Sequence, residues 1–345
     1  MKRGAILGLA AAALFGLSTP LAKVLLGSVP PVLLAGLLYL GAAAGLWLHR
    51  LARPSTSEAL LQREDLSKLS GVVVAGGILG PLLMLFGLSR VTALAGSLLL
   101  NLEAPLTVLI AVAVFHEHLG RYAAAAVAFI VVGAVILKLE PGALGADTTG
   151  VALLAGACFC WAVDNNLTQR LSLRDPFAIV RVKTLVAGVF NTALGLVVSG
   201  GRMPDARYVA GALALGSISY GISVVLDAYA LRFVGAAREA AYFATAPFVG
   251  AIAALILLKE SLRWFDVAAM LLMGVGVVLL LRERHGHVHV HDALEHEHLH
   301  VHDEHHQHEH NPGDPAMEPH SHPHVHVQLV HDHPHFPDAH HRHGH

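Results

Sequence analysis

Ten long apolar runs between Gly4 and Leu281 limit what this chain can fold into. Each run approaches the ~20 apolar residues that a helix needs to cross the hydrocarbon core of a bilayer. None shows the period-two alternation of a half-buried strand, and a helix satisfies its backbone hydrogen bonds within one segment. The sequence therefore predicts an all-α integral membrane protein with ten transmembrane helices. The expected helices are Gly4–Leu26, Pro31–Leu48, Leu69–Leu88, Val91–Phe115, Tyr122–Leu137, Gly150–Leu171, Phe177–Ser199, Tyr208–Leu231, Gly235–Leu258 and Phe265–Leu281.

The composition argues against several classes of protein. Only 14% of the residues are charged, against about 25% in soluble domains. Nucleic-acid binding has no support, because no basic stripe or aromatic platform is present. The two cysteines, Cys158 and Cys160, are too few for a disulfide framework. The spans contain no nucleophile elbow and no zinc-protease motif, and no Walker loop is present, so we expect neither an enzyme nor an ATP-driven pump.

The basic residues of the links predict the orientation. If the N-terminus is cytoplasmic, the links on that side hold 15 Lys and Arg residues and those on the opposite side hold 7. Cytoplasmic links carry such an excess in membrane proteins. Lys183 is counted on the cytoplasmic side, although it lies within the expected helix Phe177–Ser199. Ten spans return the chain to its starting side, so we expect both termini in the cytoplasm, with the chain in a bacterial inner (plasma) membrane.

The two halves of the apolar region resemble each other. The offset between matching landmarks is 143 residues at three positions and 142 at the prolines. A unit of five helices crosses the membrane an odd number of times, so its copy inserts upside down, a plan that recurs in secondary transporters. We therefore predict a first repeat at 1–140, a second at 141–282 and a tail at 283–345. The matching landmarks are Val91, Pro105, Glu117 and Gly133 in the first half and Val234, Pro247, Glu260 and Gly276 in the second.

Two segments carry a resemblance to a known family. LSRVTALAGSLLLNLEAPLTVLIAVAVFHEHLGR and its counterpart LRFVGAAREAAYFATAPFVGAIAALILLKESLRW resemble the end of the EamA-type repeat of the drug/metabolite transporter superfamily. The resemblance implies ten helices in two inverted repeats and alternating-access export or exchange of small solutes. Members commonly carry glycine before the loop glutamate, where this chain has His116 and Lys259. The histidine-rich tail is not part of the family pattern.

An ionisable side chain inside the bilayer is costly, so Glu103 in the middle of the fourth run is a candidate for function. Pro105 interrupts the backbone ladder beside it, and Asn101 and Ser97 lie one helical turn apart on one face. This combination suits a cation or amine site, or a carboxylate that couples transport to protons. The alternative is a protonated, purely structural glutamate.

A second polar patch, Asp164-Asn165-Asn166, interrupts the sixth run, and the first run has Pro20 at the matching depth. Matching broken or polar patches in two repeats point to a transport site. The alternative is a helix that ends early in water. Asp227 and Arg238 could form a cytoplasmic gate, or could both be interfacial.

The tail from Arg282 to His345 holds 23 of the 26 histidines and eleven acidic residues. Its low hydrophobicity and repeated prolines predict disorder. Alternating His-x-His suits Zn, Ni, Co or Cu, whereas the membrane domain requires no cofactor. The alternative is a tail whose charge rises on acidification. The expected metal ligands are His285, His287, His289, His291, His296, His298, His300, His302, His305, His306, His308, His310, His320, His322, His324 and His326.

These features predict a secondary-active exporter of small solutes. Its cargo could be a divalent metal cation such as Ni, Co or Zn, with a metal-binding cytoplasmic tail. Two alternatives stay open: a membrane-tethered metal buffer or sensor, and an exporter of organic metabolites or amino acids whose tail is only regulatory. The expected partners are the lipid bilayer and the transported solute or metal ion, and a homodimer is also compatible with the sequence.

Overall fold

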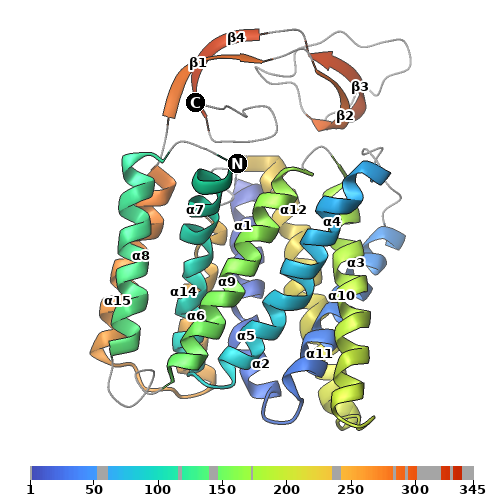
Figure 1. Cartoon of the computed structure of the whole chain (residues 1–345), viewed down its shortest axis with the longest axis vertical. Helices are drawn as coiled ribbons and strands as arrows, with labels where there is room; N and C mark the ends of the chain where they lie inside the picture. The colour runs from blue at the N-terminus through green and yellow to red at the C-terminus, as the bar shows by residue number, and fades with distance from the viewer. Residues whose placement is uncertain are drawn as a thin grey trace.

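The computed structural model describes residues 2–52, 61–115, 119–139, 147–171, 174–234 and 242–282, together with four tail segments at 285–291, 294–300, 320–326 and 329–335. The first six ranges form a bundle of helices that run roughly side by side (Figure 1). Eight of the helical stretches in these ranges are long and apolar enough to cross a membrane, and two shorter apolar helices accompany them. The prediction of an all-helical membrane domain is confirmed.

The helices group into ten spans, numbered here in chain order. Several spans consist of consecutive helical segments, and η1 (Arg63–Asp65) precedes the third. The spans are α1 (Lys2–Gly16) with α2 (Ser18–Leu25); α3 (Pro31–Ala52); α4 (Leu66–Val72), the π-helical η2 (Val73–Leu79) and α5 (Gly80–Leu88); α6 (Ala93–Leu99), the 3-10 turn η3 (Leu100–Leu102) and α7 (Glu103–Phe115); α8 (Arg121–Leu139); α9 (Thr148–Gln169); α10 (Pro176–Val198); α11 (Ala206–Gly216), the π-helical η4 (Ser217–Ile222) and α12 (Ser223–Val234); α14 (Ala246–Leu257); and α15 (Trp264–Arg282).

Aspartates cap the helices that follow three of the links. The carboxylates of Asp147, Asp175 and Asp205 accept hydrogen bonds from the backbone N–H groups of Gly150, Phe177 and Arg207 at 2.8, 2.8 and 3.0 Å. Such a cap satisfies amide donors that lack a partner within the helix. The start of α9, α10 and α11 is therefore fixed by polar residues of the links as well as by the apolar runs.

The N-terminus and the tail lie at the same end of the bundle, as an even number of spans requires (Figure 1). We call this end the terminal end and the opposite one the distal end. In the third span α4 lies nearer the terminal end than α5, whereas in the eighth span α11 lies nearer the distal end than α12. The third and eighth spans, which occupy equivalent places in the two halves, therefore run in opposite directions.

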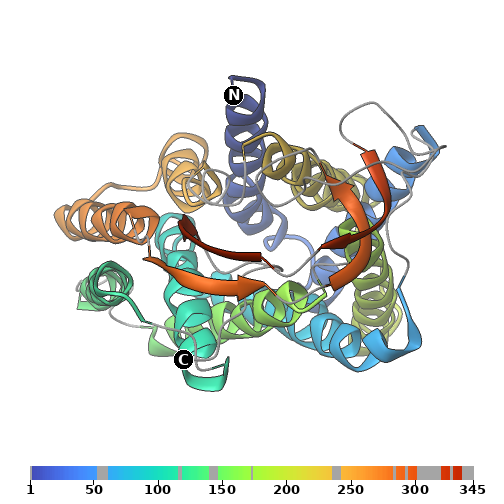
Figure 2. The same ribbon diagram turned by 90° about the horizontal axis from the view of Figure 1, so that it is seen from above.

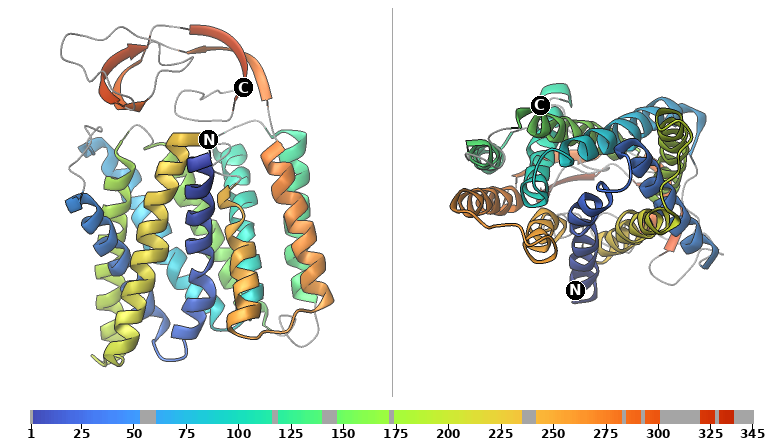
Figure 3. Two further views of the ribbon diagram at one scale, coloured as in Figure 1. Left: turned by 180° about the vertical axis from the view of Figure 1, so that it is seen from behind. Right: turned by 90° about the horizontal axis from the view of Figure 1, so that it is seen from below.

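Both of these spans contain a π-helical segment, η2 in the third and η4 in the eighth. The segments begin at Val73 and Ser217, so their offset is close to the 143 residues that separate the sequence landmarks. Packing follows the same symmetry. Span two packs on span seven and span five on span ten, and the contact of α1 with α12 mirrors that of α9 with α5 (Figure 3). The two halves thus share one internal plan with opposite orientations.

Seen from above, the helices surround a shared middle, and α8 and α15 stand side by side at one edge (Figure 2). Glycine allows the closest crossings. A Cβ on Gly36 would lie 2.3 Å from the Thr192 backbone nitrogen, and one on Gly41 would lie 2.1 Å from the Leu213 carbonyl oxygen. Spans two, seven and eight therefore touch backbone to backbone, as small residues permit in membrane bundles.

Four segments of the histidine-rich tail are extended and paired. Four strands are present: β1 (His285–His291), β2 (Leu294–His300), β3 (His320–His326) and β4 (Leu329–His335). Strand β1 pairs antiparallel with β4, and β2 pairs antiparallel with β3, giving two separate two-stranded sheets. The physical reason is the period of the sequence, because the same His-x-His alternation that suggested metal binding also matches the two-residue repeat of a strand. Composition alone did not reveal this pairing.

Candidate functional site

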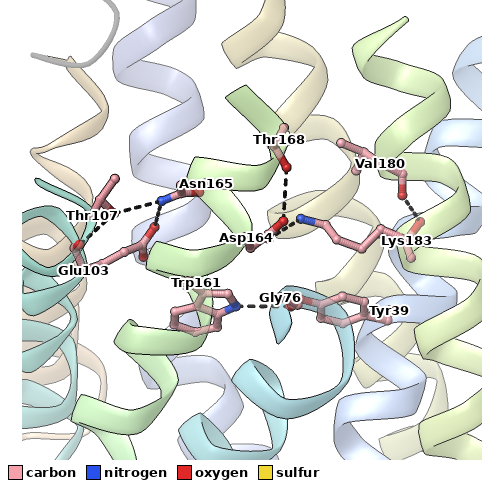
Figure 4. A network of polar contacts seen from close by, with 11 residues as sticks. Tyr39, Gly76, Glu103, Thr107, Trp161, Asp164, Asn165, Thr168, Val180 and Lys183 are labelled. Atoms are coloured by element: carbon pink, nitrogen blue, oxygen red, sulfur yellow. Dashed lines mark hydrogen bonds and ion pairs between the residues drawn. The ribbon is translucent and has the colours of Figure 1, made fainter. Parts of the chain in front are cut away.

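The polar residues that interrupt the apolar spans meet around α9, near the middle of the bundle (Figure 4). Glu103 is the first residue of α7, directly after the 3-10 turn η3. The Asn165 side-chain amide on α9 donates a hydrogen bond of 2.8 Å to Glu103 Oε1, and its nitrogen lies 3.5 Å from Thr107 Oγ1. Asn165 is exposed and Glu103 is half-buried.

A buried ion pair lies one residue away on α9. Lys183 Nζ on α10 donates to Asp164 Oδ2 at 2.7 Å, and Thr168 Oγ1 donates to Asp164 Oδ1 at 3.1 Å. The side chains of Asp164 and Lys183 are only 6% and 18% exposed. Removing two charges from water is costly, and only close mutual contact with further hydrogen bonds compensates for it. The Asp164 carboxylate is thus paired with Lys183, whereas the Glu103 carboxylate, bound by the next residue of α9, has no ion pair among the described side chains.

The π-helical segment η2 joins this network through a backbone carbonyl. The Gly76 carbonyl oxygen accepts hydrogen bonds from Tyr39 Oη at 2.8 Å and from Trp161 Nε1 at 3.2 Å. A π-helical turn interrupts the regular helical ladder and occurs often at functional sites. Gly76 also lies against the ion pair, because a Cβ on Gly76 would be 1.9 Å from Asp164 Oδ2. Spans two, three and six are thus tied together beside the Asp164 carboxylate.

Two of the expected pathway residues lie apart from this network. Ser97 is buried and donates to the Ala93 carbonyl oxygen, one turn back in its own helix. Asn101 is also buried and donates to the Leu98 carbonyl oxygen, with its amide nitrogen 3.9 Å from Met273 Sδ. Helical spacing placed both on one face, but that face packs on other helices, so they do not join Glu103.

Asn166 is buried on α9, where its amide donates to the carbonyl oxygens of Ala162 and Thr107. The alternative that α9 ends early is wrong, since the helix continues through Asn166 to Gln169. Asp227 is half-buried in α12. Its expected gate partner, Arg238, lies outside the described residues.

Several residues of the network were not expected from the sequence. Lys183 was counted only toward the charge bias of the cytoplasmic side, whereas the structure pairs it with Asp164 from within α10. The signal was available, because a lysine within an apolar run is as costly as a glutamate and needs a partner. Tyr39, Trp161 and Thr107 carry no such signal, since their polar atoms become relevant only once the helices are packed.

Among the residues whose side chains the structure describes, no group of three or more His, Cys, Asp or Glu could hold a metal ion. The donors around Glu103 are an amide and a hydroxyl, and the Cys158 thiol lies 3.6 Å from the Leu99 carbonyl oxygen. Zinc, nickel and copper sites in proteins are built mainly from several imidazoles and thiolates, and the side chains described in this region bring no such group together. The network is suited to holding an ammonium group or a proton.

Known proteins resemble the chain over nearly the whole helical region. The model of the EamA-like transporter family matches twice, at residues 2–139 and 148–282. An uncharacterized transporter of Methanothermobacter thermautotrophicus is 30% identical over 71% of this chain and 76% of its own length. A probable amino-acid metabolite efflux pump of Salmonella typhimurium is 25% identical over 80% of this chain and 93% of its own length.

A solved crystal structure shares the fold, with a TM-score of 0.61 and 20% identity over 81% of this chain and 97% of that one. The double family match agrees with the opposite directions of the third and eighth spans and with the π-helical segment in each. The chain therefore belongs to the EamA-like transporter family, whose members are membrane transporters and not enzymes.

Proposed function

We propose that this transporter exports a small organic solute that carries an ammonium group, and that Glu103 binds this group. The observation that carries the proposal is a carboxylate at mid-span without a cation. Among the side chains that the structure describes, no lysine or arginine lies within ion-pairing distance of Glu103, and Asn165 offers only a neutral amide. The relative named as a probable amino-acid metabolite efflux pump supports solutes of this class.

The Glu103 carboxylate can also couple export of the solute to the movement of protons. An uncompensated charge in the hydrocarbon core is costly, so Glu103 is most stable when it holds either a proton or the ammonium group of the solute. The proton and the ammonium group compete for Glu103. With either one bound, the protein can switch the side of the membrane toward which the site is open. Exchange of an outgoing solute for incoming protons follows from this competition. Asn165 orients the carboxylate through a hydrogen bond that both occupied states can keep.

Reconstituted vesicles test this proposal. An inside-acid or inside-alkaline gradient is imposed, and flux is measured for a panel of amino acids and amines. We expect flux that depends on the proton gradient in the wild type and a loss of at least about 100-fold in Glu103→Gln, because glutamine cannot bind an ammonium group by charge. Asn101→Ala is the matched control, since Asn101 is a buried amide on the same span outside the network. Undiminished flux in Glu103→Gln would refute the proposal.

The tail has a second proposed role, the binding of Zn, Ni, Co or Cu. Its support is the strand register, which sets histidine opposite histidine at six positions. Directly opposed residues in an antiparallel pair are about 5 Å apart, and alternate residues share a face. Two neighbouring pairs therefore supply four histidines, the number of ligands in a tetrahedral zinc site. The opposed pairs are His285 with His335, His287 with His333, His289 with His331, His296 with His324, His298 with His322, and His300 with His320.

Isolated two-stranded sheets are marginally stable in water, so bound metal would stabilise these pairings. Of the other expected ligands, His291 and His326 face leucines in the register, whereas His302, His305, His306, His308 and His310 lie outside the described residues. Equilibrium dialysis against each metal compares the full chain with a chain that ends at Arg282. We expect binding only with the tail present, and equal binding by both chains would contradict this role.

Metal export is the competing use of such a tail, and a membrane-tethered metal buffer is another. Cells that lack the protein would then accumulate Ni, Co or Zn, and the vesicle assay would show flux of these ions. The described side chains around Glu103 form no group of three or more His, Cys, Asp or Glu, which favours the organic cargo over Ni, Co or Zn. The bias of basic residues in the links supports a cytoplasmic location for both termini in an inner membrane. Reporter fusions at each terminus test this orientation.

A further inference from the structure

The distal end of the bundle is closed by contacts between the two halves. Helices α2, α6 and α14 pack pairwise on one another there. A Cβ on Gly16 would lie 2.3 Å from the Ala246 carbonyl oxygen, and one on Gly250 would lie 2.8 Å from Ser97 Oγ. Spans one and nine therefore touch backbone to backbone, and span four packs on span nine through the Ser97 side chain.

Two charged side chains hold the link between α5 and α6 at this closed end. Glu260, in the link before α15, accepts hydrogen bonds from the backbone N–H groups of Ala93 at 2.8 Å and of Leu94 at 2.8 Å. Lys23, near the end of α2, donates to the carbonyl oxygens of Leu88 at 2.6 Å and of Val91 at 2.7 Å. The acid thus caps the start of one helix and the base caps the end of the preceding one, each with the favourable sign for the helix dipole.

These contacts come from different parts of the molecule. Glu260 belongs to the second half of the chain, whereas the link that it holds belongs to the first half. The remaining orphan donor of α6, the Ala95 N–H, is satisfied locally by Thr92 Oγ1 at 3.2 Å. Thr92 caps only this one amide, so the Ala93 and Leu94 amides are capped from the other half of the chain by Glu260.

We propose that Glu260 and Lys23 form a distal latch, which must release before the site can open toward the distal end. When α2 and α14 separate from α6, the carboxylate of Glu260 leaves the Ala93 and Leu94 amides, and Lys23 leaves the two carbonyls. Both groups can then be solvated by water, so the cost of release is moderate. The latch sets how often the distal end opens, and it is separate from the cargo bound at Glu103.

Accessibility of a buried position behind the latch tests the proposal. Thr19 on α2 is 3% exposed and faces α6, where its Cγ2 would be 4.0 Å from a Cβ on Gly96. A Thr19→Cys variant is made in a background with Cys158→Ala and Cys160→Ala. An impermeant maleimide is added to right-side-out and to inside-out membrane vesicles, so the result does not depend on the orientation in the membrane.

Loss of one charge-assisted hydrogen bond corresponds to about tenfold in an equilibrium constant. We therefore expect Glu260→Ala to increase distal labelling of the cysteine at least about tenfold, with a smaller increase in Glu260→Gln, which keeps a neutral acceptor. Asp205→Asn is the matched control, because Asp205 is an acidic helix cap at the distal end that acts within its own link. It should leave labelling unchanged.

Unchanged labelling in a Glu260→Ala protein that elutes as a single folded species would overturn the latch. An equal rise in Asp205→Asn would do the same, since it would indicate general loosening. If Glu260→Ala does not fold, Lys23→Met replaces it as the opening variant. The latch then requires the same increase in distal labelling, and its absence counts against the proposal.

Discussion

Replacing Lys183 by methionine leaves Asp164 as an unpaired buried carboxylate. The two side chains meet at 2.7 Å, and Asp164 keeps only its hydrogen bond from Thr168 after the change. Removal of one partner from a buried ion pair costs about 3–5 kcal/mol. We take the lower end, about 3 kcal/mol, because the Lys183 side chain is 18% exposed and water partly screens the pair. At roughly 2 °C per kcal/mol, the apparent melting temperature should fall by about 6 °C.

The double variant Asp164→Asn/Lys183→Met removes both charges and should recover most of this loss, since a neutral pair of similar volume is often as stable as an ion pair. The control is Arg207→Met, which breaks the pair with Asp205 at 3.6 Å, where both side chains are largely exposed. Its effect should be close to zero. Thermal unfolding of the purified proteins in detergent gives all values. A Lys183→Met protein as stable as the wild type, or a double variant less stable than the single one, would refute the role of the pair.

Three further predictions concern single positions. Gly76→Ala places a methyl group 1.9 Å from Asp164 Oδ2, so it should lower both the melting temperature and the flux. Wild-type values for both would show that Gly76 and Asp164 are not in such close contact. Lys259 has a φ of 53°, a left-handed conformation that costs a residue other than glycine about 1 kcal/mol. Lys259→Gly should therefore be at least as stable as the wild type, and a lower melting temperature would contradict this strain. The hydrogen bond from the Gly150 N–H holds the pKa of Asp147 below its ordinary value of 3.8. The contribution of the Asp147 carboxylate to stability is thus complete above that value and is lost as the pH falls through the folded-state pKa. An acid titration should therefore destabilise the wild type more than Asp147→Asn below about pH 4. Parallel titration curves would count against the cap.

Local rules explain what could be predicted from the sequence. The length of each apolar run follows from the thickness of the bilayer, and the helix follows from the need to satisfy backbone groups within one segment. Glu103 and Asp164 stood out because a carboxylate in such a run is costly wherever the helix is placed. The repeat was visible because its prolines and glutamates recur at a nearly constant offset.

The partners of these residues required the packed helices. Lys183 already lay within the expected helix Phe177–Ser199, but its pairing with Asp164 depends on how α10 crosses α9. Ser97 and Asn101 share a helical face in the sequence, but neighbouring helices cover that face. The loop glutamate Glu260 matched a landmark in the sequence, yet nothing local indicates that it caps α6 in the other half.

The sequence by itself determined that this chain spans a membrane, repeats its plan once and carries a histidine-rich tail. Each of these follows from the identity and spacing of residues near one another in the chain. Only the tertiary structure decided which carboxylate is neutralised, how α6 is tied to the second half, and which histidines face one another. Those outcomes depend on contacts between residues far apart in sequence, where a shift of one helical turn or one strand residue would exchange the partners.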